Sequence, residues 1–463
     1  MENRAMQLIP YFRLFANQSL HLIHSSNSIH WLSQVPEGLE NNSLNIYMAK
    51  SSPPNVFQEY GKQFKSDFTK FLQLRSEEII CGGHMVLTLA GRSVADPTSD
   101  DGCCLWELLA QSLLDMVKEE IAIRKVLPVL RHTIKGITNH DLFSGRCFKI
   151  ADLGCSSSKN TLLVAFNIMD IVVELCEENN LKPPQFHVCL NDLIGNDFNT
   201  LFNLLPDFYA KLHKEKGENF GPCFISAAPG SFYRRLFSDQ SMHLVHSSNG
   251  VHWLSQVPEG LESNMLNIYI AKSSPLNVFQ AYEKQFETDF TKFLQMRSEE
   301  VVCGGRMVLT FCGRSIDDPT SDDGCRLWEL LAESLFDMVK EGLVRESDIS
   351  SFNVPIYYPG EDEVRDIIQN EGSFSLESLA TFQVDWDPQN MDYKNFNDFV
   401  EPSQTRGENT TKGMRAVIEP LLTSHFGKSI TDGLFKKYHK YVAQHLSNNK
   451  PGFFSFVISL AKK

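Results

Sequence analysis

The chain has 463 residues, of which 42% are hydrophobic and 22% charged. These proportions are ordinary for a folded globular protein and exclude a largely disordered or fibrous one. The formal net charge of −14 disfavours a protein that binds nucleic acid by neutralising phosphates. No apolar run approaches the ~18 residues that a transmembrane helix needs. We therefore expect a protein without nucleic-acid or membrane partners, whose length allows about two or three domains.

The eleven cysteines are scattered, and only Cys103 and Cys104 are adjacent. No C-x-x-C pair occurs, which argues against a disulfide framework and against a zinc ribbon. The N-terminal sequence MENRAMQLIPYFRLF lacks the basic-then-apolar layout of a signal peptide. We expect reduced thiols and a cytoplasmic location.

A long internal repeat dominates the chain. Residues 31–40 read WLSQVPEGLE and recur unchanged at 253–262, and the same offset aligns Tyr11 with Tyr233 without a gap as far as Glu120. About three quarters of the aligned positions are identical, and the unit is far too long for a solenoid repeat. Residues 1–120 are therefore predicted to be a partial duplicate of 223–342. A fusion of two tandem paralogues, either real or introduced by gene prediction, explains such a duplicate.

The repeated segment reads as half of an α/β domain. Residues 21–26 are a short strand candidate, and residues 54–78 carry apolar side chains at helical spacing. A glycine-bounded apolar run, HMVLTLAG, follows and is typical of a buried parallel strand. Strand, helix and strand predict a βαβ unit in each copy, with an apolar helix face that belongs to a core. In the first copy this face comprises Phe57, Tyr60, Phe64, Phe68, Phe71 and Leu72.

The middle of the chain, residues 121–232, occurs once. Residues 123–137 form an amphipathic helix pattern, 147–178 read as strand, tight turn and helix, and 186–205 as strand, acidic end and helix. This alternation predicts an α/β fold with a Rossmann-like, doubly wound sheet over 121–342. Residues 343–463 read as a mostly helical cap with returning strands. Ligands bind such sheets at the carboxyl ends of their strands.

Four elements could form a ligand site, although three of them also have a structural explanation when taken alone. Asp152 ends a strand before a turn at Gly154, but a tight turn explains this, and no GxGxxG fingerprint is present. Asp192 ends the next strand, where it could bind a ribose diol or only cap a helix. Ser231 and Phe232 follow a Pro-Gly turn and suit the edge and face of an adenine. His252 and Trp253 could donate hydrogen bonds to a ligand or form a core pair.

Together and in this order, these elements resemble the plant SABATH family of S-adenosylmethionine-dependent methyltransferases. The family's motifs appear here as ADLGCSSSKN, NDLIGNDFN, PGSFYRRLFS, HSSNGVHWLSQVPEGLE, SFNVPIYYPGEDEV and MRAVIEPLLTSHFG. The resemblance spans about three quarters of the chain, from residue 121 to 463. Members methylate small carboxylic acids such as salicylate, benzoate and jasmonate, or ring nitrogens of xanthines.

The resemblance also implies roles for individual residues. S-adenosylmethionine would be held by Asp152, Cys155, Asn160, Asp192, Leu193, Ser231 and Phe232. His252 and Trp253 would orient the acceptor, with no catalytic base, because a carboxylate is already a nucleophile. The acceptor pocket would further be lined by Asn249, Cys312, Leu327, Trp328, Tyr357, Met414 and Val417. Some relatives have a Mg²⁺ site at the positions of Asn264, Phe352 and Asn353, although its acidic member is Ser350 here. A homodimer is a further expectation.

Two departures from the family shape the functional expectation. The motif with which members begin, MNGGxGxxSYAxNSxxQ, is missing, and residues 1–120 contain neither an ADLGC nor an NDL element. The Gly-Pro of the family's first turn is Ser158-Lys159, and a common aromatic is Asn249. We expect methyl transfer to the carboxylate of a small plant acid. The alternatives are a xanthine N-methyltransferase, or a catalytically impaired fused paralogue that acts by binding or dimerising.

Overall fold

A computed structural model describes residues 13–91, 93, 125–137, 147–387 and 403–463, apart from short gaps at 27, 40–41, 43–46, 50–51, 218–219, 221, 263 and 265. The chain divides into two compact units, Met1–Val117 and Lys118–Lys463. The expected domain boundary at residues 120–121 lies outside the described residues. Each unit is considered by itself.

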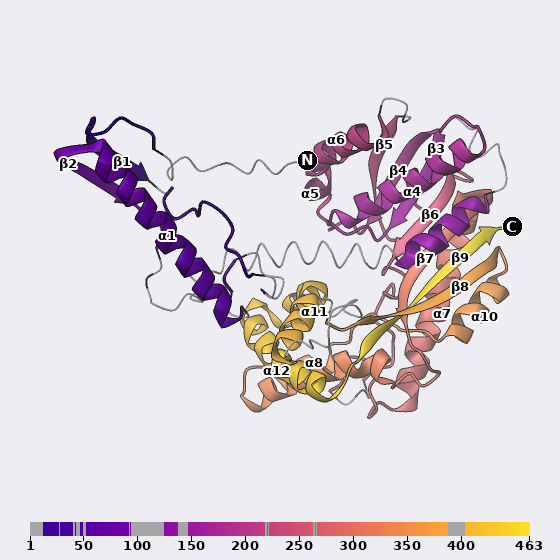
Figure 1. The fold of residues 1–463 in the computed structure, drawn as a ribbon. Helices are drawn as coiled ribbons and strands as arrows, with labels where there is room; N and C mark the ends of the chain where they lie inside the picture. Colours follow the sequence, from indigo (N-terminus) through magenta and orange to yellow (C-terminus); the bar gives the residue numbers. More distant parts are fainter. Residues whose placement is uncertain are drawn as a thin grey trace. The chain divides into compact units, whose positions relative to one another are not determined.

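The first unit contains one βαβ element. Strand β1 (Leu20–Ser26) pairs in parallel with β2 (Ile79–Thr88), and helix α1 (Pro54–Glu78) connects them (Figure 1). Proline occupies the first turn of α1, where no amide donor is needed, and the chain becomes extended at Ile79. These elements confirm the strands and the helix predicted from the sequence.

Burial in the first unit is less than the sequence predicts. Phe71 and Ile29 form a small buried cluster, with Phe68 packed against it. Phe64 and Leu72, expected in a core, are exposed, and β2 is only partly buried. The physical reason is that, within the described part of this unit, β1 and β2 pair only with each other.

The second unit is built on a seven-stranded sheet with the order β5-β4-β3-β6-β7-β9-β8. The strands are β3 (Cys147–Leu153), β4 (Gln185–Asp192), β5 (Cys223–Pro229), β6 (Met242–Ser248), β7 (Val301–Gly313), β8 (Phe374–Asp385) and β9 (Gly452–Lys462). The first five are parallel, whereas β9 runs antiparallel to both β7 and β8. From β3, the strand order runs through β4 to β5 at one edge of the sheet, and the chain then returns so that β6 lies on the other side of β3. The predicted doubly wound sheet is confirmed, and its topological switch point lies between β3 and β6.

Two hydrophobic clusters occupy the two faces of this sheet, as the alternation of side chains along strands requires. On β6, Leu244 belongs to one cluster and Val245 to the other. The Leu244 cluster includes residues of the helical segment 125–135 and of α4 (Asn160–Glu178), α5 (Phe198–Asn203) and α6 (Leu205–Lys216). The Val245 cluster includes residues of α7 (Leu276–Glu300), α8 (Asp322–Lys340), α9 (Glu346–Ser350), α10 (Glu361–Glu371), α11 (Ser403–Phe426) and α12 (Thr431–Asn448). The core is therefore formed by layers of helices on both sheet faces.

The part of the chain after residue 343 returns to the main sheet. It supplies the antiparallel strands β8 and β9, together with helices α11 and α12, which pack against each other and, through α12, against α8 (Figure 1). A single 3₁₀ turn, η4 (Lys428–Ile430), links α11 to α12. Within the described ranges, no helix is long and apolar enough to cross a membrane.

Candidate functional site

A buried carboxylate lies at the switch point of the sheet. Asp152 is next to last in β3, and its neighbour in the register of β6 is His246. The Nδ1 atom of His246 lies 2.7 Å from Oδ1 of Asp152, and the hydroxyl of Thr161, in the first turn of α4, donates to Oδ2. All three side chains are buried. Asn160, which begins α4, precedes Thr161, so two of the predicted cofactor residues lie at this point.

The turns after β3 and β4 are tied together by backbone and carboxylate hydrogen bonds. Gly154 has φ +74°, a conformation that favours glycine, and its N–H donates to the carbonyl of Asn191 over 2.9 Å. The carboxylate of Asp192 accepts the N–H of Ser156 over 2.7 Å and that of Leu193 over 2.7 Å. Asp192 is therefore held rigidly at the strand end, with acceptor capacity remaining for a ligand.

Cys155 lies in the same turn, between the two aspartates. Its side chain is buried, and this burial, followed by the negative charges of Asp152 and Asp192, raises the pKa of its thiol far above the ordinary value. The thiol is therefore neutral at physiological pH. A neutral thiol suits packing against a ligand and does not suit nucleophilic catalysis.

The turn after β5 completes this edge of the sheet. The side-chain amide of Asn191 donates to the carbonyls of Ala228 and Gly230, at 2.6 and 2.9 Å. Phe232 lies against the backbone of the first turn: a Cβ atom on Gly154 would be 3.8 Å from its ring. Strands β3, β4 and β5 thus bring together Asp152, Cys155, Asp192, Ser231 and Phe232. Leu193 is beside them and exposed.

His252 and Trp253 are held between β7 and the segment 352–358. The Nδ1 atom of His252 accepts the N–H of Cys312 over 3.0 Å, so the ring proton of the neutral imidazole is on Nε2. Burial lowers the pKa of His252 to about 3. The carbonyl of Trp253 accepts the hydroxyl of Tyr233 over 2.5 Å, and its backbone forms a bridge with Ile356. His252 is therefore a fixed, neutral hydrogen-bond donor.

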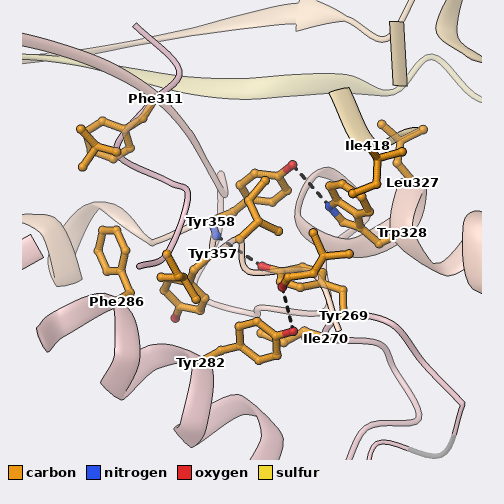
Figure 2. Packing of buried hydrophobic residues seen from close by; sticks show 14 of the residues in the cluster. Tyr269, Ile270, Tyr282, Phe286, Phe311, Leu327, Trp328, Tyr357, Tyr358 and Ile418 are labelled. Carbon is orange, nitrogen blue, oxygen red and sulfur yellow. Dashed lines mark hydrogen bonds between the residues drawn. The ribbon is translucent and has the colours of Figure 1, made fainter. Parts of the chain in front are cut away.

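An aromatic cluster contacts His252 through Tyr358. The indole N–H of Trp328 donates to the hydroxyl of Tyr358 over 3.3 Å (Figure 2). The ring of Tyr358 meets that of His252 edge-on, with 5.8 Å between the ring centroids. Tyr358 is a residue that sequence reasoning missed. It occupies a variable position of the motif SFNxPxYxPSxxEV, so the motif itself carried no signal for it.

The remaining predicted acceptor residues divide into two groups. Leu327, Trp328, Tyr357 and Met414 are buried in one cluster, and Cys312 packs against it. The hydroxyl of Tyr357 is engaged by the ion pair of Arg314 and Glu363 rather than being free for a ligand. Asn249 and Val417 are exposed. The roles of both groups stay predictions.

The residues predicted for Mg²⁺ are joined by hydrogen bonds instead. The amide of Asn264 donates to Oδ1 of Asn353 over 3.1 Å, and its oxygen accepts the hydroxyl of Ser274 over 2.6 Å. Phe352 has no side-chain ligand atom, and the hydroxyl of Ser350 donates to a backbone carbonyl. Mg²⁺ prefers carboxylates and water, so this donor set does not fit the ion. Among the described residues, no group of three His, Cys, Asp or Glu side chains could hold a metal.

Comparisons with known proteins identify the family of this chain. The family described as SAM dependent carboxyl methyltransferase matches residues 10–122 and again residues 120–463. The chain belongs to this family. This match confirms that the chain is a SAM-dependent carboxyl methyltransferase, as the motifs indicated. The family matches twice because the chain contains the internal repeat.

Curated relatives of this carboxyl methyltransferase align with about two thirds of its chain. It is 48% identical over 313 residues to S-adenosyl-L-methionine:benzoic acid/salicylic acid carboxyl methyltransferase 3 of Petunia hybrida, covering 68% of this chain and 85% of the relative. It is 43% identical over 335 residues to jasmonate O-methyltransferase of Arabidopsis thaliana, covering 68% and 86%. The solved structure of loganic acid methyltransferase with SAH matches with a TM-score of 0.62 and 29% identity, covering 80% of this chain and 98% of that one.

Proposed function

We propose that the second unit transfers the methyl group of S-adenosylmethionine to the carboxylate of a small plant acid of the salicylate, benzoate or jasmonate type. When bound, S-adenosylmethionine supplies a methyl group on a sulfonium that is ready for in-line displacement. The protein then has to position the two reactants and exclude water between them.

The cofactor end of this proposal rests on the switch-point edge of the sheet. Asp152 and Asp192 present two carboxylates whose orientations are fixed by hydrogen bonds. The methionine end of S-adenosylmethionine carries an ammonium group, and its ribose carries a diol. Both groups can donate hydrogen bonds to a carboxylate. Asp152, with Cys155 and Asn160, would hold the first, and Asp192 the second. Leu193, Ser231 and Phe232 would surround the adenine.

The observation that carries the choice of acceptor is the fixed tautomer of His252. Because its Nδ1 accepts the N–H of Cys312, its Nε2 can only donate, and burial keeps the ring uncharged down to about pH 3. A donor suits an acid, because a carboxylate accepts hydrogen bonds and is already ionised at neutral pH. A xanthine ring nitrogen that carries a proton would need a base, which this tautomer of His252 cannot provide. The geometry therefore favours carboxyl transfer over N-methyl transfer.

The test is a methyl-transfer assay of the full chain with labelled S-adenosylmethionine and a panel of salicylate, benzoate, jasmonate and 7-methylxanthine. We expect a methyl ester of at least one acid and no methylated xanthine. Methylation of the xanthine alone would support the N-methyltransferase alternative. Binding of S-adenosylhomocysteine without turnover of any acceptor would support the impaired paralogue.

Asp192→Ala tests the cofactor end separately. Loss of hydrogen bonds from a diol to a carboxylate costs about 1.5–3 kcal/mol, which corresponds to a tenfold to hundredfold weaker affinity for S-adenosylhomocysteine. Isothermal titration calorimetry measures this affinity and also the stoichiometry. We expect one site per chain, because residues 1–120 lack both cofactor motifs. An unchanged affinity in a folded variant would reject the assignment of Asp192.

The proposal also includes a homodimeric, cytoplasmic enzyme. Light scattering coupled to size-exclusion chromatography would test the first property, and the distribution of a fluorescent fusion in plant cells the second.

A further inference from the structure

His246 has no role in the proposal above, yet its imidazole lies within hydrogen-bond distance of the predicted cofactor carboxylate of Asp152. Its Nδ1 lies 2.7 Å from Oδ1 of Asp152, and both side chains are buried. Because a carboxylate oxygen accepts, the Nδ1–H of His246 donates. Thr161 donates to the other oxygen. Each oxygen of Asp152 therefore has one fixed donor and one lone pair left.

We propose that His246 is a positioning residue for the cofactor site, an inference that rests on the proposed function of Asp152. With Thr161, it holds the carboxylate of Asp152 in the orientation that receives the ammonium group of S-adenosylmethionine. Without the His246 donor, the carboxylate would keep only the Thr161 contact, and rotation about its Cβ–Cγ bond would no longer be opposed from the side of β6.

The location of the pair supports this role. Backbone pairing between β3 and β6 runs only over Ile150–Leu153 and Leu244–Ser247, so the two strands share a short register at the switch point. The hydrogen bond between Asp152 and His246 links β3 and β6 near the carboxyl ends of these strands, where ligands bind to such sheets. His246 thus connects the strand that leads to His252 and Trp253 with the strand that leads to the cofactor turn.

The internal repeat supplies a matched control. His24 occupies in β1 the position that His246 occupies in β6, within the sequences HLIHSS and HLVHSS. His24 is exposed, and β1 pairs only with β2 within the described residues. The same substitution at His24 therefore tests the residue type in the same local sequence without the aspartate of β3.

The experiment compares His246→Asn, His246→Gln and His24→Gln in the full chain. An Asn amide nitrogen can take the place of Nδ1, whereas a Gln amide reaches beyond it. Affinity for S-adenosylhomocysteine is measured by calorimetry, and unfolding by circular dichroism. We expect His246→Gln to weaken binding about tenfold and His246→Asn to stay within about threefold of the unsubstituted chain, as loss of one charge-assisted hydrogen bond predicts. His24→Gln should leave the affinity unchanged.

A double-mutant cycle separates positioning from stability. If His246 acts through Asp152, His246→Gln should weaken binding by less than about twofold in an Asp152→Asn background, because the two effects share one contact. Equal losses for the Asn and Gln variants, or additive losses in the cycle, would overturn the inference. Unchanged binding in His246→Gln would also overturn it while leaving the proposed function intact. Failure of the unsubstituted chain to bind S-adenosylhomocysteine would overturn both.

Discussion

The two copies of the repeat adopt the same local structure. Strands β1 and β2 pair in the same parallel register as β6 and β7, including the irregularity after the first residue pair. Ser33 donates to Asp67 as Ser255 donates to Asp289, with all four distances between 2.7 and 2.8 Å. The hydrogen bond from the hydroxyl of Ser52 to Asn42 has the same length, 2.6 Å, as that from Ser274 to Asn264. Because the first copy has this hydrogen bond as well, the bond is a property of the repeated loop and not of a metal site.

The copies differ in what surrounds them. Leu22 is 61% exposed, whereas its equivalent Leu244 is 0% exposed, and Val86 and Val308 are 51% and 0% exposed. In the second unit β6 pairs with β3 and β7 pairs with β9, and the cluster containing Leu244 and Val308 includes the helical segment 125–135 and α4. The local sequence thus specifies the βαβ element, and its neighbours decide which residues are buried.

The same difference separates the predicted acceptor residues from their duplicates. His30 accepts the N–H of Ala90 over 3.2 Å, as His252 accepts that of Cys312. The side chain of Trp31, however, is 49% exposed. The backbone of Trp253 forms a bridge with Ile356, and the segment that contains Ile356 has no counterpart in residues 1–120. The first copy therefore contains equivalents of the predicted acceptor residues but none of the cofactor motifs. Its family membership therefore does not imply a second active site.

The comparison predicts its largest contrast at a buried strand position. Leu244→Asp places a charge in a closed core and should destabilise the second unit by about 5 kcal/mol or more, whereas Leu22→Asp should change stability by less than about 0.5 kcal/mol. Urea denaturation followed by circular dichroism measures both. Similar large losses for the two variants would mean that the apolar face of β1 is covered in solution.

A buried ion pair provides the second contrast. Arg297 is fully buried, pairs with Glu300 at 2.8 Å and donates to the carbonyls of Phe232 and Arg234 at 3.0 and 2.7 Å. Arg297→Met leaves Glu300 buried without its cation and should cost about 3–5 kcal/mol. It should also weaken S-adenosylhomocysteine binding, because the main chain at Phe232 loses its anchor.

Arg75→Met is the matched control, since Arg75 pairs with Glu78 at 2.8 Å in the first copy. We expect it to leave cofactor affinity unchanged, as measured by calorimetry. If both arginine variants bind S-adenosylhomocysteine normally, the contacts of Arg297 with the turn after β5 do not contribute to cofactor binding.

Much of this fold was readable from the sequence, because periodic apolar patterns and glycine-bounded strands are local signals. The strands that end near Asp152 and Asp192, the helices that follow them and both copies of the βαβ element lie where the sequence predicts. The exposure of Phe64 and Leu72 was not readable, since their equivalents are buried by elements far away in the sequence. The contact of Asp152 with His246 was missed for the same reason: His246 is 94 residues away and meets it only through strand pairing.

The buried imidazole of His252 predicts a pH dependence of stability. Burial lowers the pKa of His252 from its ordinary 6.5 to about 3. Below pH 6.5 the unfolded chain binds a proton that the folded chain does not, so stability is lost as the pH falls towards 3. The loss is about 1.4 kcal/mol per pH unit, or about 2.7 kcal/mol at pH 4.5. His252→Asn should remove this part of the slope in urea denaturation at pH 7.0, 5.5 and 4.5.

His30→Asn is the corresponding change in the first copy and should leave the slope of the second unit's transition as it is. Addition of S-adenosylhomocysteine identifies that transition, because a ligand stabilises only the unit that binds it. Identical slopes for His252→Asn and the unsubstituted chain would show that the imidazole becomes protonated within the fold.

The smallest contrast concerns the indole nitrogen of Trp253. Trp253→Phe keeps an aromatic ring at this position and removes the indole N–H, so acceptor binding should lose about 1.5 kcal/mol while S-adenosylhomocysteine affinity is retained. This corresponds to roughly a tenfold fall in kcat/KM for the acid that the enzyme prefers. Trp31→Phe, at the equivalent position of the first copy, should change neither quantity, because residues 1–120 lack the cofactor motifs. Steady-state kinetics with salicylate, benzoate and jasmonate measure the effect. Equal kinetics for the two variants would assign Trp253 to packing, and a loss in Trp31→Phe would mean that the duplicated segment contributes to the working site.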